Sequence, residues 1–174
     1  MRTSLKITAT IFEIFFIIVI WCSIIYANNS RDSLKECNKI IDIEERLNCI
    51  GNLLLKSDSE SLKVELFNSL IGYWIKRDGA MGYALSDIFL EILEDDPHFF
   101  LSQMKKYGEQ FNEWLDRLQY LSFTWHLDPP SPLPEKKAKL IDLIIKFKPT
   151  NDDEEVLQKK FLKKLKSITP RQID

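Results

Sequence analysis

The chain has 174 residues, of which 45% are hydrophobic and 29% charged, and its formal net charge is −2. This length fits one ordinary domain, and the composition excludes a disordered or collagen-like polymer. The slightly negative charge gives no support to nucleic-acid binding, which needs a cationic surface. We therefore expect one folded domain that does not bind nucleic acid.

The N-terminus has the pattern of an export signal. Arg2 and Lys6 form a short basic start, and the apolar run Ile11–Ala27 follows. Because this run ends on a small residue before a polar sequence, the pattern favours cleavage after Ala27. The prediction is a signal peptide over residues 1–27 and a periplasmic or extracellular domain over residues 28–174.

An uncleaved signal anchor over residues 7–27 is the alternative. The apolar run approaches the roughly 20 residues that span a bilayer, although Glu13 shortens its uninterrupted part. In this interpretation the protein is held in the membrane by its first segment.

The cysteines support an oxidising compartment. Cys22 lies in the signal segment, which leaves the even pair Cys37 and Cys49 in the exported domain. An even pair in an exported protein predicts a disulfide, with two free buried thiols in one long helix as the alternative.

A disulfide between these positions requires a bend in the chain. Twelve residues along one straight helix would separate the cysteines by about 18 Å, which is beyond disulfide reach. Asp42 and Glu45 have the spacing of a capping box, which marks a new helix start. We therefore expect one helix over residues 31–39 and another over residues 43–56.

Apolar residues recur at three- and four-residue spacing through most of the remaining chain, as is typical of amphipathic helices. These stripes cover residues 62–74, 81–93, 99–107, 111–125, 140–147 and 157–168. Asp78-Gly79 is interpreted as the end of the first of these helices, with a left-handed residue there. Asp96 and Pro97 should cap and begin another helix, and Trp74 and Trp114 should lie in the core.

No alternating strand pattern of convincing length appears, so the predicted fold class is all-α. We expect a single domain of about eight short helices, packed as antiparallel hairpins in a bundle or a short solenoid-like array. Residues 128–134 hold four of the seven prolines and should form a stiff connector. The two helices after this connector should pack on the preceding ones.

Signatures of catalysis are absent from the sequence. The five glycines are scattered, and neither G-x-S-x-G nor H-E-x-x-H occurs. No nucleophile can be paired with His98 or His126, which we expect to have structural or solvated roles. We predict no catalytic residue, cofactor or metal site, while an active site assembled from distant residues stays the alternative.

Four carboxylates are the first candidate partner-binding surface. Asp87, Glu91 and Asp95 follow one another at intervals of four residues, with Glu94 adjacent, so they should share an exposed helix edge. We call these four residues the acidic ridge. It could bind a basic partner or a divalent cation, and a solvated helix face without a ligand is the alternative.

The final helix supplies a second candidate surface. Residues 28–134 carry a net charge of −7, whereas residues 135–174 carry +4. The basic residues of the final helix are Lys159, Lys160, Lys163, Lys164 and Lys166. They could touch anionic lipid or an acidic partner, or lie across the acidic body of the same or a second molecule, and we favour the same molecule. The acidic run Asp152–Glu155 should satisfy the positive end of this helix.

These observations predict an exported, non-catalytic protein-binding module, for example an inhibitor or an immunity-type neutraliser of a toxin. A small exported enzyme with a dispersed site and a membrane-anchored envelope protein are the alternatives. The expected partner is another protein, and a homo-oligomer is compatible with the same features.

Overall fold

The computed structural model describes residues 32–125 and 132–172, and the regular secondary structure of this part of the chain is helical apart from one pair of two-residue strands. The all-α prediction is therefore confirmed. A helical segment at residues 32–39 precedes α2 (Ile43–Leu55), α3 (Glu60–Lys76), α4 (Gly79–Asp95), α5 (Pro97–Lys106), α6 (Gly108–Ser122), β1 (Thr124–Trp125), α7 (Leu133–Lys146), α8 (Asp152–Ser167) and β2 (Arg171–Gln172). Within these ranges no helix is both long and apolar enough to cross a membrane. The predicted signal segment lies outside the described residues.

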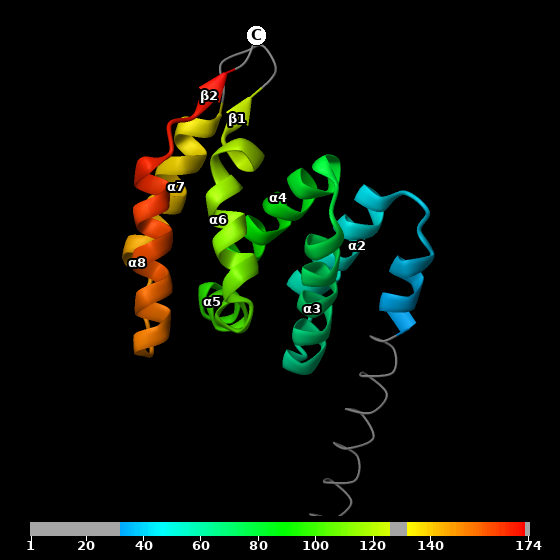
Figure 1. Ribbon diagram of the computed structural model, residues 1–174. Helices are drawn as coiled ribbons and strands as arrows, with labels where there is room; N and C mark the ends of the chain where they lie inside the picture. The colour runs from blue at the N-terminus through cyan, green and yellow to red at the C-terminus, as the bar shows by residue number, and fades with distance from the viewer. Residues whose placement is uncertain (1–31, 126–131, 173–174) are drawn as a thin grey trace, which may run out of the picture.

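The helices form a layered array with α4 at its centre. Figure 1 shows α3, α6 and α8 side by side, with α7 next to α8 at the end of the molecule away from α2. Helix α4 packs against α2, α3, α5 and α6, and α8 packs against α5 and α7. The two C-terminal helices are thus packed on the preceding ones, as the sequence predicted.

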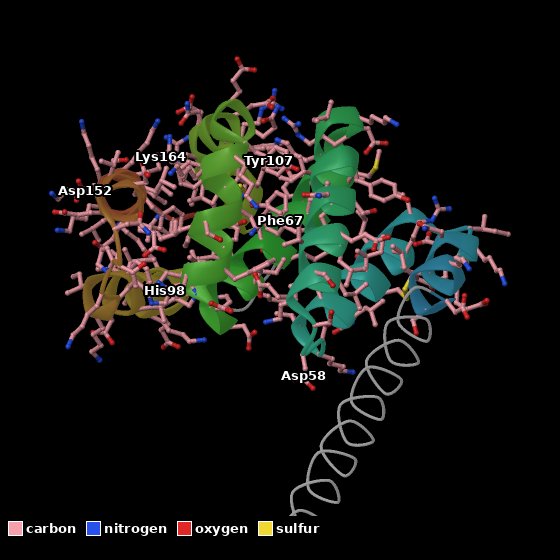
Figure 2. All side chains as sticks on the ribbon, turned by 90° about the horizontal axis from the view of Figure 1, so that it is seen from below. Asp58, Phe67, His98, Tyr107, Asp152 and Lys164 are labelled. Carbon is pink, nitrogen blue, oxygen red and sulfur yellow. A yellow bond between two sulfur atoms is a disulfide. The ribbon has the colours of Figure 1, made fainter. Side chains whose placement is uncertain are left out.

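An aromatic cluster fills the interior. Trp74 and Trp114 are completely buried, which confirms their predicted place in the core. Figure 2 shows Phe67 in the middle of the array, and its ring lies 5.9 Å from that of Phe89. Trp114 of α6 stacks on Phe161 of α8 with 5.6 Å between the ring centroids, so this pair fixes α8 to the body of the molecule.

Two predicted helix starts are confirmed by their capping hydrogen bonds. The backbone N–H of Glu45 donates to the carboxylate of Asp42 at 2.9 Å, and that of Phe99 donates to Asp96 at 3.0 Å. Pro97 occupies the first turn of α5, where no backbone N–H is needed. These short-range signals fix the helix boundaries locally.

The interpretation of Asp78-Gly79 as a helix end with a left-handed residue is wrong. Helix α3 ends at Lys76, and Arg77 continues as extended chain with φ −60° and ψ 146°. Asp78 instead begins α4, because its carboxylate accepts a hydrogen bond from the backbone N–H of Met81 at 3.0 Å. A carboxylate is a strong N-cap, and here that role outweighs the glycine signal.

The predicted helix over residues 111–125 also ends earlier than expected. Helix α6 stops at Ser122, and β1 pairs in parallel with β2 of the C-terminal segment. The backbone N–H of Arg171 donates to the carbonyl of Phe123 at 3.0 Å. Trp125 therefore belongs to a strand, because its extended backbone pairs with Gln172 near the C-terminus.

The predicted connector over residues 128–134 is shorter than expected at its C-terminal end. Residues 126–131 lie outside the described part of the chain. Leu133 and Pro134 belong to the first turn of α7. Proline is tolerated there because first-turn N–H groups have no partner within the helix.

The disulfide between Cys37 and Cys49 is present, and the two Cα atoms lie 5.6 Å apart. It ties the helical segment at residues 32–39 to α2 across the non-helical residues 40–42. The bend required by the cysteine spacing is therefore confirmed, in contrast to the alternative of two free thiols in one helix.

A buried polar network between α4 and α6 gives a first testable prediction. The indole N–H of Trp114 donates to the hydroxyl of Ser86 at 2.9 Å, and that hydroxyl lies 2.7 Å from the hydroxyl of Ser122. In Ser86→Ala the indole N–H loses its acceptor, so the free energy of unfolding should fall by about 1–3 kcal/mol in urea denaturation. Ser122→Ala should cost less, because Trp114 keeps its acceptor, and equal losses in the two variants would contradict this account.

Candidate functional site

The acidic ridge lies along α4 as predicted, beside a hollow of about 630 Å³ between α4 and α7. Asp87, Glu91 and Glu94 line this hollow together with the buried side chain of Leu90. Asp95 is exposed at the last residue of α4, beyond the hollow. Three of the four ridge residues therefore share one concave surface.

Two ridge carboxylates are neutralised across the helix interface. Lys136 Nζ lies 2.9 Å from Asp87 Oδ1, and Lys139 forms an ion pair with Glu94. Sequence reasoning missed both lysines as ridge partners, because they follow the ridge by more than 40 residues. The basic excess after residue 134 was the signal that could have suggested them.

The other two ridge carboxylates stay unneutralised. Glu91 and Asp95 are exposed, and neither has an ion-pair partner within residues 32–125 and 132–172. Asp95 also lies at the C-terminal end of α4, where the helix dipole disfavours an anion. The ridge therefore keeps two negative charges for which the described structure offers no compensation.

The lysines of α8 partly lie across the same molecule, in agreement with the interpretation that we favoured. Lys160 donates to the side-chain carbonyl of Asn112, and Lys164 Nζ lies 3.8 Å from Asp116 Oδ1. Both partners belong to α6, so these contacts cross from α8 to its neighbour.

The remaining lysines of this surface form no ion pair or hydrogen bond with another helix of the described residues. Lys159 pairs with Glu155 one turn earlier on the same helix. Lys163 and Lys166 are exposed, and in the described part of the chain neither has a hydrogen-bond or ion-pair partner. The second candidate surface thus holds two free cations.

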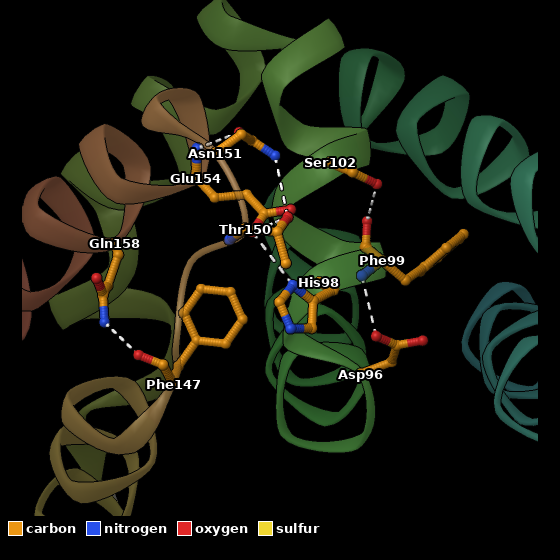
Figure 3. Close-up of polar contacts among 9 residues, drawn as sticks. All are labelled: Asp96, His98, Phe99, Ser102, Phe147, Thr150, Asn151, Glu154 and Gln158. Carbon is orange, nitrogen blue, oxygen red and sulfur yellow. Dashed lines mark hydrogen bonds and ion pairs between the residues drawn. The ribbon is translucent and has the colours of Figure 1, made fainter.

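His98 has a structural contact with the start of α8, shown in Figure 3. Its Nδ1 lies 3.1 Å from Glu154 Oε2, and its ring packs on Phe147 with 4.6 Å between ring centroids. The backbone N–H of Thr150 donates to the same carboxylate oxygen at 2.8 Å. Glu154 is buried, so this cluster joins α5 to the first turn of α8. His126 lies outside the described residues.

The charge state of Glu154 gives a second prediction. Burial favours the neutral carboxyl, but the hydrogen bonds from Thr150 and His98 outweigh burial and hold the pKa of Glu154 below its ordinary value. A lowered pKa stabilises the fold above the unfolded-state pKa, and this stability is lost as the pH falls through the folded-state pKa. Glu154→Gln should therefore be less stable than the wild type near pH 7, and the difference should shrink on acidification.

Urea denaturation of both proteins at neutral and acidic pH measures this effect. Glu155→Gln, an exposed neighbour in the same helix turn, is the matched control and should stay close to the wild type. A stability gap between Glu154→Gln and the wild type that is independent of pH would contradict the assignment.

A second hollow, of about 330 Å³, lies between α6 and the junction of α3 with α4. Arg77 pairs with Glu113 there and stacks on Trp74, with 3.6 Å between the guanidinium carbon and the ring centroid. The hydrogen bond from Arg77 lowers the pKa of the Glu113 carboxyl against the effect of burial. Sequence reasoning missed this cluster, because Arg77 and Glu113 are 36 residues apart and share no local motif.

The fold and these surfaces define an all-helical domain with charged hollows between neighbouring helices. Within the described ranges, no three His, Cys, Asp or Glu side chains come together in a way that could hold a metal ion. Comparisons with protein-family models, curated proteins and solved structures found no match to this chain.

Proposed function

We propose that this protein is an exported, non-catalytic protein-binding module that receives a basic segment of a partner in the hollow between α4 and α7. The observation that supports this function is that Glu91, in the lining of a hollow of about 630 Å³, is exposed and has no ion-pair partner in the described residues, and that the same holds for Asp95, one turn further along α4 and beyond the hollow. An inhibitor or a toxin neutraliser acts in this way, by occupying a partner rather than by transforming it.

The chemistry of the hollow fits a basic polypeptide. Exposed carboxylates speed the encounter with a basic partner, because their attraction extends over about 8–10 Å at ordinary ionic strength. The exposed Pro132 in the lining offers apolar contact, and Lys136 and Lys139, which lie with Glu135 on the opposite wall, would repel a uniformly cationic chain. The hollow therefore favours a segment in which basic and apolar residues alternate.

Export is part of the proposal. The basic start and apolar run at the N-terminus are typical of a signal segment, and a disulfide is typical of an oxidising compartment. Residues 1–31 lie outside the described structure, so the distinction between a cleaved signal and an anchor requires the mass of the isolated protein.

Neutralising the two free carboxylates tests the proposed function. The double variant Glu91→Gln/Asp95→Asn keeps both ion pairs to α7, so folding should be unchanged. Association with a partner captured by the wild type should slow by about tenfold, and its dependence on salt should flatten. Surface-based association kinetics at several salt concentrations measure both effects.

Glu44→Gln/Asp58→Asn is the matched control, because both residues are exposed and lie outside α4 and α7. This control should bind as the wild type does. Equal association rates and salt slopes for the wild type and the ridge variant would contradict the α4–α7 hollow as the binding site.

A further inference from the structure

A basic surface lies beside α6, and its hollows share no lining residue with the proposed α4–α7 site. One hollow of about 330 Å³ and another of about 260 Å³ lie on either side of this helix. Their linings contain five basic and three acidic side chains, namely Arg77, Arg117, Lys160, Lys163 and Lys164 against Asp78, Glu113 and Asp116. We call this set the basic face.

The charge of the basic face is opposite to that of the whole chain, which is −2. Arg117 is 58% exposed although it lies 3.3 Å from Glu113 Oε1. Lys163 is exposed without a partner in the described ranges, and Lys166 follows it three residues later on the same side of α8. Figure 2 shows Lys164 on the side of α8 toward α6, where its Nζ lies 3.8 Å from Asp116 Oδ1. The excess cations of this face are therefore available to a ligand.

Exposed apolar side chains lie beside these cations. Ile75 and Tyr120 border the first hollow and are 61% and 59% exposed. Tyr120 packs on Tyr83 with 5.3 Å between ring centroids, which holds its ring in place on the surface. Covering these two side chains with another apolar surface would be favourable.

We propose that the basic face docks on an anionic lipid surface. Its lysine and arginine side chains would contact headgroup phosphates, and Tyr120 and Ile75 would enter the interfacial region, where amphipathic aromatic side chains are favoured. The basis for this proposal is charge complementarity together with the exposed apolar groups in the lining of the first hollow.

The shape of the face favours a lipid surface over an acidic polypeptide. The cations come from α6, from α8 and from the short link between α3 and α4, and α6 and α8 lie side by side in Figure 1. They surround two separate hollows rather than one continuous groove, whereas a bound polypeptide segment would need a continuous groove. An array of headgroups can contact both hollows at once.

Vesicle binding by the full chain tests this inference. The N-terminal sequence, with its basic start and apolar run, is the same in every variant, so phosphatidylcholine vesicles give the baseline, and the change that a variant makes in the additional binding to vesicles containing phosphatidylglycerol is the readout. We expect this additional binding for the wild type and expect it to weaken with salt. Lys163→Glu/Lys166→Glu breaks no hydrogen bond or ion pair of the described residues and should reduce the additional binding roughly 25-fold or more, at about a factor of five for each cation lost.

Lys56→Glu/Lys148→Glu is the matched control, since both lysines are exposed and lie outside the basic face. Retention of anionic binding by this control, with its loss in Lys163→Glu/Lys166→Glu, supports the proposal. Equal losses in the two double variants, or equal wild-type binding to neutral and anionic vesicles, would overturn it. Binding of a polyglutamate peptide without any preference for anionic vesicles would also overturn it, in favour of an acidic protein partner.

Discussion

Trp114→Ala is expected to lower the free energy of unfolding by about 3–5 kcal/mol, because it removes a large side chain from the centre of the core. Trp114 is fully buried, and its indole contacts aromatic rings from four different helices. These rings belong to Phe89, Phe100, Phe111 and Phe161. A cavity at this position cannot be closed by the movement of one neighbour, so the cost should lie in the upper part of the range.

Urea or thermal denaturation monitored by circular dichroism measures this loss. Tyr120→Ala is the matched control, because Tyr120 is an exposed aromatic residue of the same helix and should cost much less. Trp74→Ala should behave like Trp114→Ala, since Trp74 is equally buried. Stability close to that of the wild type in both tryptophan variants would mean that these apolar stripes do not form the core.

The stacking of Trp114 on Phe161 adds a structural consequence. Because this pair joins α6 to α8, its loss should weaken the attachment of α7 and α8 as well as the core itself. Hydrogen exchange of the variant should therefore increase most in α8. Hydrogen exchange of this variant thus compares the local stability of α7 and α8 with that of the other helices.

The helices could be predicted from the sequence because their signals are short-range. Apolar spacing of three and four residues placed the stripes, and the carboxylates of Asp42 and Asp96 marked helix starts that the structure confirms. The error at Asp78-Gly79 has the same origin. Gly79 is a signal for the end of a helix, and Asp78 is a signal for the start of one. The sequence around these two residues does not show which of the two signals decides the local structure.

The ridge and its surroundings show where local signals fail. The spacing of the carboxylates correctly placed them on one edge of α4, but which of them are neutralised depends on the position of α7. Lys136 and Lys139 reach Asp87 and Glu94 only because α7 packs beside α4. The contact between His98 and Glu154, which spans 56 residues, depends in the same way on the packing of α5 against α8. Long-range pairs of this kind require the fold before they can be assigned.

The disulfide was predicted from two kinds of sequence signal, one from the whole chain and one local. The even cysteine count and the export signal predicted the bond, and the bend that it requires was marked by the local capping signal at Asp42. The bond joins the helical segment at residues 32–39 to α2. Leu34 of this segment is only partly buried against the core. Few other apolar contacts hold this segment, so its attachment should depend strongly on the disulfide.

Cys37→Ser and Cys49→Ser are each expected to lower the free energy of unfolding by about 2–4 kcal/mol, because either change opens the same loop and releases its chain entropy in the unfolded state. The double variant should lose no more than the single variants. Denaturation with and without a thiol reductant provides the control. Reductant should destabilise the wild type by the same amount and leave the double variant unchanged, whereas two titratable thiols in freshly isolated, unreduced protein would show that the bond does not form.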